Sequence, residues 1–198
     1  MGGSTPLLQT LKELEKNGIP GEILTTNYLN FSEPKALEKL HGLSNITLKM
    51  YDVEKAAEGF HTKGYAVAVK VEDIINRLKV ENISDIIILT CKTEEKSALA
   101  EYIHNGKYNG IKFTTCRKFK GLEVDAVILV DVDGNVFGEE HKLLYYVGTS
   151  RARLVLDIVT DMDDFECENV LQSVIKYNKK IKKPKRELAM ALNAVPII

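Results

Sequence analysis

The 198-residue sequence has few cysteines and no long apolar segment. Cys91, Cys116 and Cys167 form no Cys-x-x-Cys pair, which argues against a zinc site and against a disulfide framework. No apolar run approaches the roughly 20 residues that a membrane-spanning helix needs. The first residues lack the basic start and the apolar core of a signal peptide. We therefore expect a protein of a reducing, cytoplasmic setting with no membrane partner.

The sequence also lacks a Gly-x-x-x-x-Gly-Lys-Ser/Thr segment, the loop that holds phosphates in many nucleotide hydrolases. The chain alone is therefore without the lysine and the magnesium ligand on which that chemistry depends. Hydrophobic residues make up 44% and charged residues 28%, as in an ordinary globular protein.

The formal net charge of −1 hides an uneven distribution of charge. Five acidic residues lie between Asp161 and Glu168, and seven basic residues with no acidic one lie between Lys176 and Arg186. A basic block of this kind can be a nucleic-acid-binding arm, but it is more often a solvated helix or tail. Both interpretations stay open from the sequence.

Alternating strand and helix patterns predict a doubly wound α/β fold with a mostly parallel sheet. The apolar runs 85–90, 125–132 and 154–160 are typical of strands that are buried on both faces. Further expected strands are 21–29, 46–53 and 110–116, and expected helices are 6–17, 32–40, 71–78, 92–103 and 139–153. The last 25 residues or so are expected to form a helical, basic tail.

In such a sheet, function lies at the carboxyl ends of the strands. The first of these ends, Thr114-Thr115, opens into the basic, glycine-containing loop 116–121. Backbone N–H groups and positive charges in such a loop can hold phosphate oxygens. The alternative is an ordinary solvated loop.

The second strand end carries the sequence Asp131-Val132-Asp133-Gly134-Asn135. Paired aspartates could hold Mg²⁺, as in a magnesium-dependent phosphatase. The phosphatase pattern fits badly, because its usual threonine is Asn135 here and its nucleophile strand is normally near the N-terminus. We favour turn chemistry, in which Asp and Gly end the strand and no metal is needed.

The third feature is the segment Tyr145–Arg153, expected to be helical. Arg151 would then project from the helix end that faces the carboxyl edge of the sheet. Taken alone, an arginine near a helix C-terminus usually complements the helix dipole.

Taken together, these segments resemble those of superfamily-one DNA helicases of the UvrD/Rep type. Thr115 and Lys120-Gly121-Leu122-Glu123, followed by an apolar strand, resemble motif V of that family, and Tyr145–Arg153 resembles motif VI, commonly written YVAxTRAR. Upstream, Leu24–Asn30 resembles the Asn-Tyr-Arg segment that opens the second RecA-like lobe. Asp85–Ile103 resembles the next strand and helix, so the resemblance covers roughly residues 22–160.

The resemblance implies a RecA-like lobe that helps to bind ATP and Mg²⁺ held mainly by an N-terminal lobe carrying the phosphate-binding loop. Arg151 would be the arginine that reaches the γ-phosphate, an interaction typically worth on the order of 10³ to 10⁵ in rate. Glu123 would approach the ribose, Gly121 would allow close approach of the loop, and Tyr28 would stack on the adenine.

The resemblance also implies contacts with single-stranded DNA. Thr115 and Arg117 would touch the DNA backbone, with Arg117 in the place where many members have histidine. Lys120 would hold the loop together and add positive potential.

Three departures from the family limit these roles. Besides the missing phosphate-binding loop, Leu29 follows Asn27-Tyr28 where the family has a second γ-phosphate arginine, which weakens the role of Tyr28. The short interval 91–110 leaves no room for the inserted subdomain of larger members. We expect residues 1–20 to be an N-terminal helix or extension, 21–160 the helicase lobe, and 161–198 an acidic turn with the basic tail.

The leading hypothesis is thus the second motor lobe of an ATP-dependent helicase or translocase, as an excised domain rather than a stand-alone relative. Such a lobe would be incomplete without its N-terminal partner lobe. The alternative is a non-enzymatic nucleic-acid- or protein-binding module derived from such a lobe. A magnesium-dependent phosphatase using Asp131 and Asp133 is the third hypothesis.

Overall fold

The computed structural model describes residues 46–57, 62–138 and 141–197. Six strands form one all-parallel sheet in the order β3-β2-β4-β5-β1-β6. They are β1 (Thr47–Asp52), β2 (Ile86–Thr90), β3 (Lys112–Thr115), β4 (Val124–Val130), β5 (Ala152–Thr160) and β6 (Val195–Ile197). The doubly wound α/β class is thereby confirmed. Across the described residues, no helix has the length and apolar character needed to cross a membrane.

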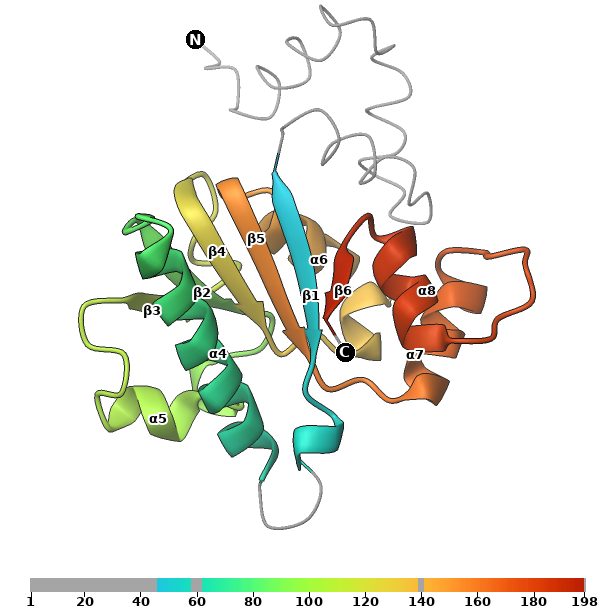
Figure 1. The fold of residues 1–198 in the computed structure, drawn as a ribbon, viewed down its shortest axis with the longest axis horizontal. Coiled ribbons are helices and arrows are strands. Elements are labelled where there is room, and N and C mark those ends of the chain that lie inside the picture. The colour runs from blue at the N-terminus through green and yellow to red at the C-terminus, as the bar shows by residue number, and fades with distance from the viewer. Residues whose placement is uncertain (1–45, 58–61, 139–140, 198) are drawn as a thin grey trace, which may run out of the picture.

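Helices cover both faces of the sheet (Figure 1). They are α4 (Lys63–Val80), α5 (Ala100–His104), α6 (Lys142–Thr149), α7 (Asp164–Ser173) and α8 (Pro184–Ala191), with short 3-10 turns η1 (Lys55–Ala57), η2 (Glu94–Lys96) and η3 (Gly134–Phe137). The chain enters α4 through Thr62, whose hydroxyl accepts a hydrogen bond from the Tyr65 N–H at 3.3 Å. Helix α4 ends before Asn82, which adopts φ 60°, a conformation that asparagine tolerates better than most residues.

The strand residues alternate between two hydrophobic cores, one on each face of the sheet. In β2, Ile86 and Ile88 pack toward α4, whereas Ile87 and Leu89 pack in the core that includes residues of α6, α7 and α8. All five residues of β2 are buried, as the apolar run 85–90 predicted. The other strands expected at 46–53, 110–116, 125–132 and 154–160 are confirmed, as is the helix at 71–78.

The helix expected at 92–103 is mostly wrong. This segment contains only the short turn η2 and the five-residue helix α5. Between them, the Ser97 hydroxyl and the Ala98 N–H both donate to the carboxylate of Asp131, at 2.6 and 2.9 Å. Because these groups bind a side chain from β4's carboxyl end, the backbone cannot form a continuous helix there.

The helix expected at 139–153 ends early, at Thr149. Arg151 is not on the helix: its carbonyl accepts a hydrogen bond from the Val124 N–H at 3.1 Å, and β5 begins at the next residue. The position predicted for Arg151, facing the carboxyl edge of the sheet, is therefore wrong. Helix α6 returns the chain to the start of a parallel strand, so its last residue must lie at the amino edge.

The C-terminal residues do not form a detached tail. The expected acidic turn begins α7, with a capping box in which Asp163 and Glu166 each accept from the other's backbone N–H. The basic block is mainly a loop that leads into α8, and β6 then pairs with β1 in parallel. Pro196 is accommodated because β6 lies at the edge of the sheet. The elements expected at 6–17, 21–29 and 32–40 lie outside the described residues.

One buried ion pair fastens α4 to the sheet. Asp157 of β5 is fully buried, and its carboxylate accepts a hydrogen bond from Arg77 of α4 at 2.5 Å. Arg77 also pairs with Glu81 one turn further along the helix, at 2.9 Å. Burial raises the pKa of Asp157 to about 6, against the opposing charge of Arg77.

We expect Arg77→Ala to lower the free energy of unfolding by about 3 kcal/mol near neutral pH, because a buried carboxylate loses its partner. The folded-state pKa of Asp157 is above its ordinary value, so its ionisation opposes folding, and this contribution to stability is lost as the pH rises through about 6. The loss in Arg77→Ala should therefore be smaller at about pH 5 than at about pH 8, as measured by urea denaturation.

Glu81→Ala is the matched control, because it removes only the exposed partner of Arg77 and should cost a few tenths of a kcal/mol. Equal losses in the two variants, or a loss in Arg77→Ala that ignores pH, would contradict the role assigned to the buried pair.

Candidate functional site

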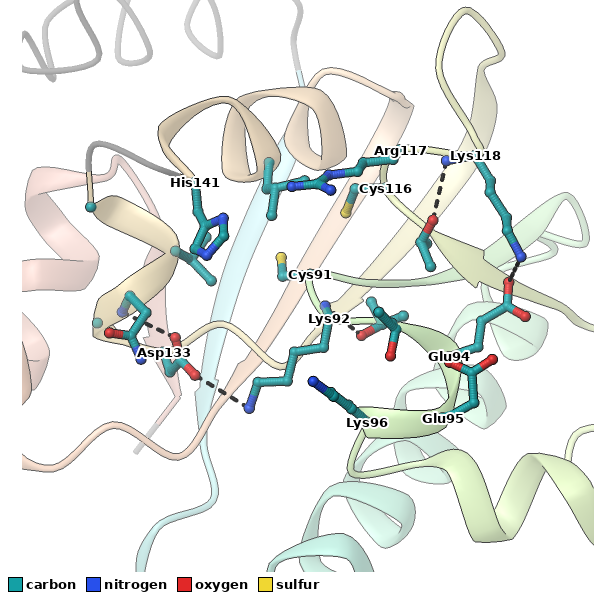
Figure 2. A pocket seen from close by; sticks show the side chains of 18 residues that line it. Cys91, Lys92, Glu94, Glu95, Lys96, Cys116, Arg117, Lys118, Asp133 and His141 are labelled. Carbon is teal, nitrogen blue, oxygen red and sulfur yellow. Dashed lines mark hydrogen bonds and ion pairs between the residues drawn. The ribbon is translucent and has the colours of Figure 1, made fainter.

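The carboxyl edge of the sheet carries a large groove of about 990 Å³. Residues 90–96 and 115–118, which follow β2 and β3, form one part of its wall, and residues 133–136 with Gly138, His141 and Leu144 form the other. Figure 2 shows these side chains around the opening. We call this space the carboxyl-edge groove. It lies where ligands usually bind in open α/β sheets.

Basic side chains line the carboxyl-edge groove, and acidic neighbours neutralise some of them. Lys92 pairs with Asp133 at 3.3 Å, and Lys118 pairs with Glu94 at 3.1 Å. Across residues 46–57, 62–138 and 141–197, Arg117 has no such carboxylate partner. Arg117 therefore keeps its full hydrogen-bonding capacity for an anion in the groove.

Asp131 supports the floor of the groove from below. Its buried carboxylate accepts hydrogen bonds from the Thr90 hydroxyl at 2.6 Å, the Ser97 hydroxyl at 2.6 Å and the Ala98 N–H at 2.9 Å. The residue itself adopts φ 60°, a left-handed conformation that turns the chain sharply at the end of β4. Asp131 thus ties the ends of β2 and β4 to the segment that leads into α5.

Asp133 performs a different task from Asp131. Its carboxylate accepts from the Asn135 N–H at 3.0 Å and caps η3, while it also pairs with Lys92. The two aspartates therefore serve separate partners, in agreement with turn chemistry. Among the described residues, no group of three or more His, Cys, Asp or Glu side chains could hold a metal ion. This geometry gives the phosphatase hypothesis no support.

The amino edge of the sheet brings together three other predicted residues, Gly121, Glu123 and Arg151, which we call the amino-edge cluster. The Val124 N–H donates to the Arg151 carbonyl, so the residues just before β4 lie beside the end of α6. Gly121 has φ +86°, and a Cβ built there would meet no atom within 4 Å. The turn thus needs glycine for its conformation and leaves open space beside it.

Arg151 and its neighbour Arg153 differ in their surroundings. The Arg151 Nε–H donates to the Val147 carbonyl of α6 at 3.1 Å, which fixes the side chain as far as Nε. In the described part of the chain no carboxylate pairs with its guanidinium. Arg153, in contrast, pairs with Asp85 at 2.9 Å and Asp125 at 2.8 Å. Of the two arginines, Arg151 is thus the one that is held in place while its terminal guanidinium N–H groups pair with no carboxylate of the described residues.

The structure separates the predicted site residues into two groups. Thr115 and Arg117 line the carboxyl-edge groove, whereas Gly121, Glu123 and Arg151 lie at the amino edge. Lys120 is exposed but does not line the groove, and Tyr28 lies outside the described residues.

Sequence reasoning missed two basic residues of the groove, Lys92 and Lys96, whereas Lys118 belongs to the basic loop 116–121 that the sequence had indicated. The available signal for Lys92 and Lys96 was their position directly after the expected strand 85–90, at the carboxyl edge of a parallel sheet.

Comparison with known proteins shows which part of the chain is similar to a known family. Residues 110–159 match the family model of the UvrD-like helicase C-terminal domain. This range contains both Lys120–Glu123 and Tyr145–Arg153, the segments on which the resemblance to UvrD/Rep-type helicases rests. That resemblance is confirmed: this part of the chain is similar to a UvrD-like helicase C-terminal domain.

Two further comparisons found similar proteins. Gabija protein GajB from Bacillus cereus (strain VD045) is 24% identical over 201 residues, which cover 84% of this chain and 40% of GajB. The chain thus spans about two fifths of the length of this curated relative. Among solved structures, the C-terminal domain of a possible DNA helicase from Lactobacillus plantarum WCFS1 matches with a TM-score of 0.46 and 17% identity, covering 68% of this chain and 82% of that one.

We expect Asp131→Asn to lower the free energy of unfolding by about 1.5 to 3 kcal/mol, because it weakens hydrogen bonds to a buried charged acceptor. Asp133→Asn should cost about 1 kcal/mol or less, since that residue caps only a short turn at the surface. Chemical denaturation of both variants measures the difference. Similar losses, or a magnesium-dependent phosphomonoesterase activity that Asp131→Asn abolishes, would contradict the structural role of Asp131.

Proposed function

We propose that this chain acts as the second motor lobe of an ATP-dependent DNA helicase or translocase. The observation that carries the proposal is the division of its candidate residues between two edges of one sheet. The amino-edge cluster offers a carboxylate, an open glycine turn and an arginine whose guanidinium pairs with no carboxylate in the part of the chain that the structure describes. The carboxyl-edge groove offers a basic surface large enough for a nucleic-acid strand. A motor lobe needs both kinds of site.

A partner lobe fits the amino edge for a second reason. Leu122 and Leu154 remain exposed there, at 52% and 50% of their surfaces, one beside Glu123 and the other near the start of β5. Apolar side chains at the rim of a charged cluster favour contact with another protein surface. We infer that an N-terminal lobe with a phosphate-binding loop covers this edge and holds most of the ATP and the Mg²⁺ ion.

The residues present fit a nucleotide phosphate and ribose at this edge. Arg151 would direct its free guanidinium N–H groups to the terminal phosphate, where negative charge is stabilised during transfer. Glu123, which is exposed, would accept hydrogen bonds from ribose hydroxyl groups, and Gly121 leaves room for close approach. Bound ATP with Mg²⁺ would supply the phosphoryl group and its charge neutralisation. Tyr28 stays a prediction for adenine stacking.

We expect Arg151→Ala, in the full-length protein that contains both lobes, to reduce DNA-stimulated ATP hydrolysis by about 10³-fold or more. Folding should survive, because among the described residues the side chain makes a single hydrogen bond, to a helix carbonyl. The measurement is steady-state phosphate release with saturating single-stranded DNA, together with thermal unfolding of the variant.

Arg153→Ala is the matched control for this experiment. It removes an arginine two residues away whose guanidinium is already paired with Asp85 and Asp125. Its turnover should stay within a few fold of the parent, with a small loss of stability from exposed ion pairs. Full turnover in Arg151→Ala, or equal losses in both variants, would overturn the assignment of Arg151.

The carboxyl-edge groove is proposed to bind the backbone of single-stranded DNA. Thr115 offers its hydroxyl and Arg117 its unpaired guanidinium, with Lys92, Lys96 and Lys118 adding positive potential. Phosphate contacts of this type release counterions, so the affinity should fall steeply with salt. The role of Lys120 in DNA binding stays a prediction, because its side chain lies outside the groove.

We expect Arg117→Ala to weaken binding of an oligothymidylate and to make the salt dependence shallower by about 0.7 in the log–log slope, one phosphate contact for a single strand. Lys107→Ala is the charge-matched control, because Lys107 pairs with Glu72 and lies outside the groove. Fluorescence anisotropy across a salt series measures both slopes. An unchanged slope in Arg117→Ala, or an equal change in Lys107→Ala, would remove the groove from the proposed DNA path.

A non-enzymatic binding module is the second candidate function. Leu29 favours it, because leucine stands where an arginine contact to the γ-phosphate would be expected from the family. Arg151, whose guanidinium pairs with no carboxylate of the described residues, and the open Gly121 turn favour the motor instead. Salt-dependent DNA binding with no ATP hydrolysis by the full-length protein would select the module.

A further inference from the structure

Two of the three cysteines lie side by side at the carboxyl edge. Thr90 of β2 and Thr115 of β3 are paired in register, so Cys91 and Cys116 follow as the next pair along two parallel strands. The Cys116 N–H donates to the Thr90 carbonyl at 3.0 Å, which continues the ladder up to the cysteines. Both side chains belong to the same core and line the carboxyl-edge groove.

The two sulfur atoms face one another. Figure 2 shows them pointing toward each other at the floor of the groove, and the neighbouring Cys116 side chain is the largest cause that raises the pKa of the Cys91 thiol. Neighbouring strands lie about 4.7 to 4.9 Å apart, within the Cα spacing of about 4.4 to 6.8 Å that disulfides allow. In-register side chains on one face start further apart than the usual Cβ spacing of a disulfide, about 3.8 Å. A bond here would pull the strand ends together and would be easily reduced.

The position of the pair connects it to the groove. Cys116 stands between Thr115 and Arg117, and Cys91 stands between Thr90 and Lys92. A Cβ built on Gly148 of α6 would lie 3.0 Å from the Cys116 sulfur, so helix α6 packs closely behind this cysteine. A shift of either sulfur must therefore move the groove wall, because the core behind it cannot yield.

We propose that Cys91 and Cys116 are a redox-active dithiol, which a hydroperoxide converts to a disulfide and thiols restore, and that the disulfide changes the shape of the carboxyl-edge groove. One thiol loses its proton and its sulfur attacks the hydroperoxide; an S–O bond forms, the O–O bond breaks, and an alcohol or water leaves. The second sulfur then attacks the sulfenic acid, an S–S bond forms, the S–O bond breaks, and the departing hydroxide takes up the second thiol proton as water. The dithiol loses two electrons and the peroxide gains them.

The surroundings of the pair should make its oxidation slow. The neighbouring Cys116 side chain, together with burial, raises the pKa of the Cys91 thiol. Cys91 and Cys116 are only 7% and 0% exposed, so a small oxidant must enter through the groove. A strand of DNA lying in that groove would shield the sulfurs, which makes the reaction specific to the unloaded protein. This last effect rests on the proposed DNA-binding function.

The test is oxidation of the full chain with hydrogen peroxide, followed by thiol counting and mass-spectrometric mapping of disulfide peptides. We expect two of the three thiols to be lost together, a Cys91–Cys116 disulfide, and full recovery of both with dithiothreitol. Oligothymidylate affinity should fall at least several fold on oxidation and return on reduction. Bound oligothymidylate should slow the oxidation.

Three variants make the result decisive. Cys91→Ser and Cys116→Ser should each abolish both the disulfide and the change in DNA affinity, whereas Cys167→Ser should retain both. Cys167 is the matched control because it is buried in α7 outside the groove, where burial raises its thiol pKa to about 12. The absence of a disulfide after prolonged treatment with excess peroxide, or a disulfide that includes Cys167, would overturn the dithiol assignment.

The two proposals can fail separately. If the reduced protein binds no DNA, the proposed function is refuted. The mapped disulfide would still show whether Cys91 and Cys116 are a redox-active pair. A disulfide that forms without altering the DNA affinity of a DNA-binding protein would overturn the effect on the groove.

Discussion

Every strand of this sheet runs in the same direction, and that constraint decides where each functional group lies. In a parallel sheet, each connection must carry the chain back from the carboxyl edge to the amino edge before the next strand begins. Residues that follow a strand therefore gather at one edge, and residues that precede a strand gather at the other. Thr115 ends β3 and Arg117 follows it, whereas Glu123 and Arg151 precede β4 and β5. The direction of the strands alone separates the proposed DNA groove from the proposed nucleotide edge.

Asp131 fixes the shape of the carboxyl edge of the sheet. Three donors from β2 and the segment after it converge on one buried carboxylate. Because the strand ends are fixed in this way, the side chains of residues 90–96 present a defined wall to the groove. The hydrogen bonds to Asp131 interrupt the helix in this segment, and they also fix the backbone that carries Lys92 and Lys96. The interruption of the helix thus contributes to the wall of the groove.

The sequence predicted secondary structure correctly where the pattern of apolar residues reflects which faces of a strand are buried. The runs 85–90, 125–132 and 154–160 are mostly apolar because both sheet faces are covered, and all three contain strands. Gly121 and Arg151 could be selected from their motif, but the edge assigned to Arg151 was wrong. The helix period continues smoothly through Tyr145–Arg153, and only the pairing of Val124 with Arg151 shows where the helix gives way. Long-range hydrogen bonds of this kind leave no trace in local periodicity, and the same holds for Ser97 and Ala98 on Asp131.

The short connection between β3 and β4 joins the two edges directly. Residues 116–123 leave the groove at Cys116, pass the buried Phe119 and reach the amino edge at Glu123 without an intervening helix. Anchored in the core by Phe119 and tied to α6 through Val124 and Arg151, this segment cannot shift at one end without strain at the other. In the proposed motor, a change in the contacts at the nucleotide edge would thus displace Arg117, because segment 116–123 joins the two edges and is packed into the core. Cys116, at the groove end of the same segment, is then well placed for oxidation to affect DNA binding more than the packing of the sheet.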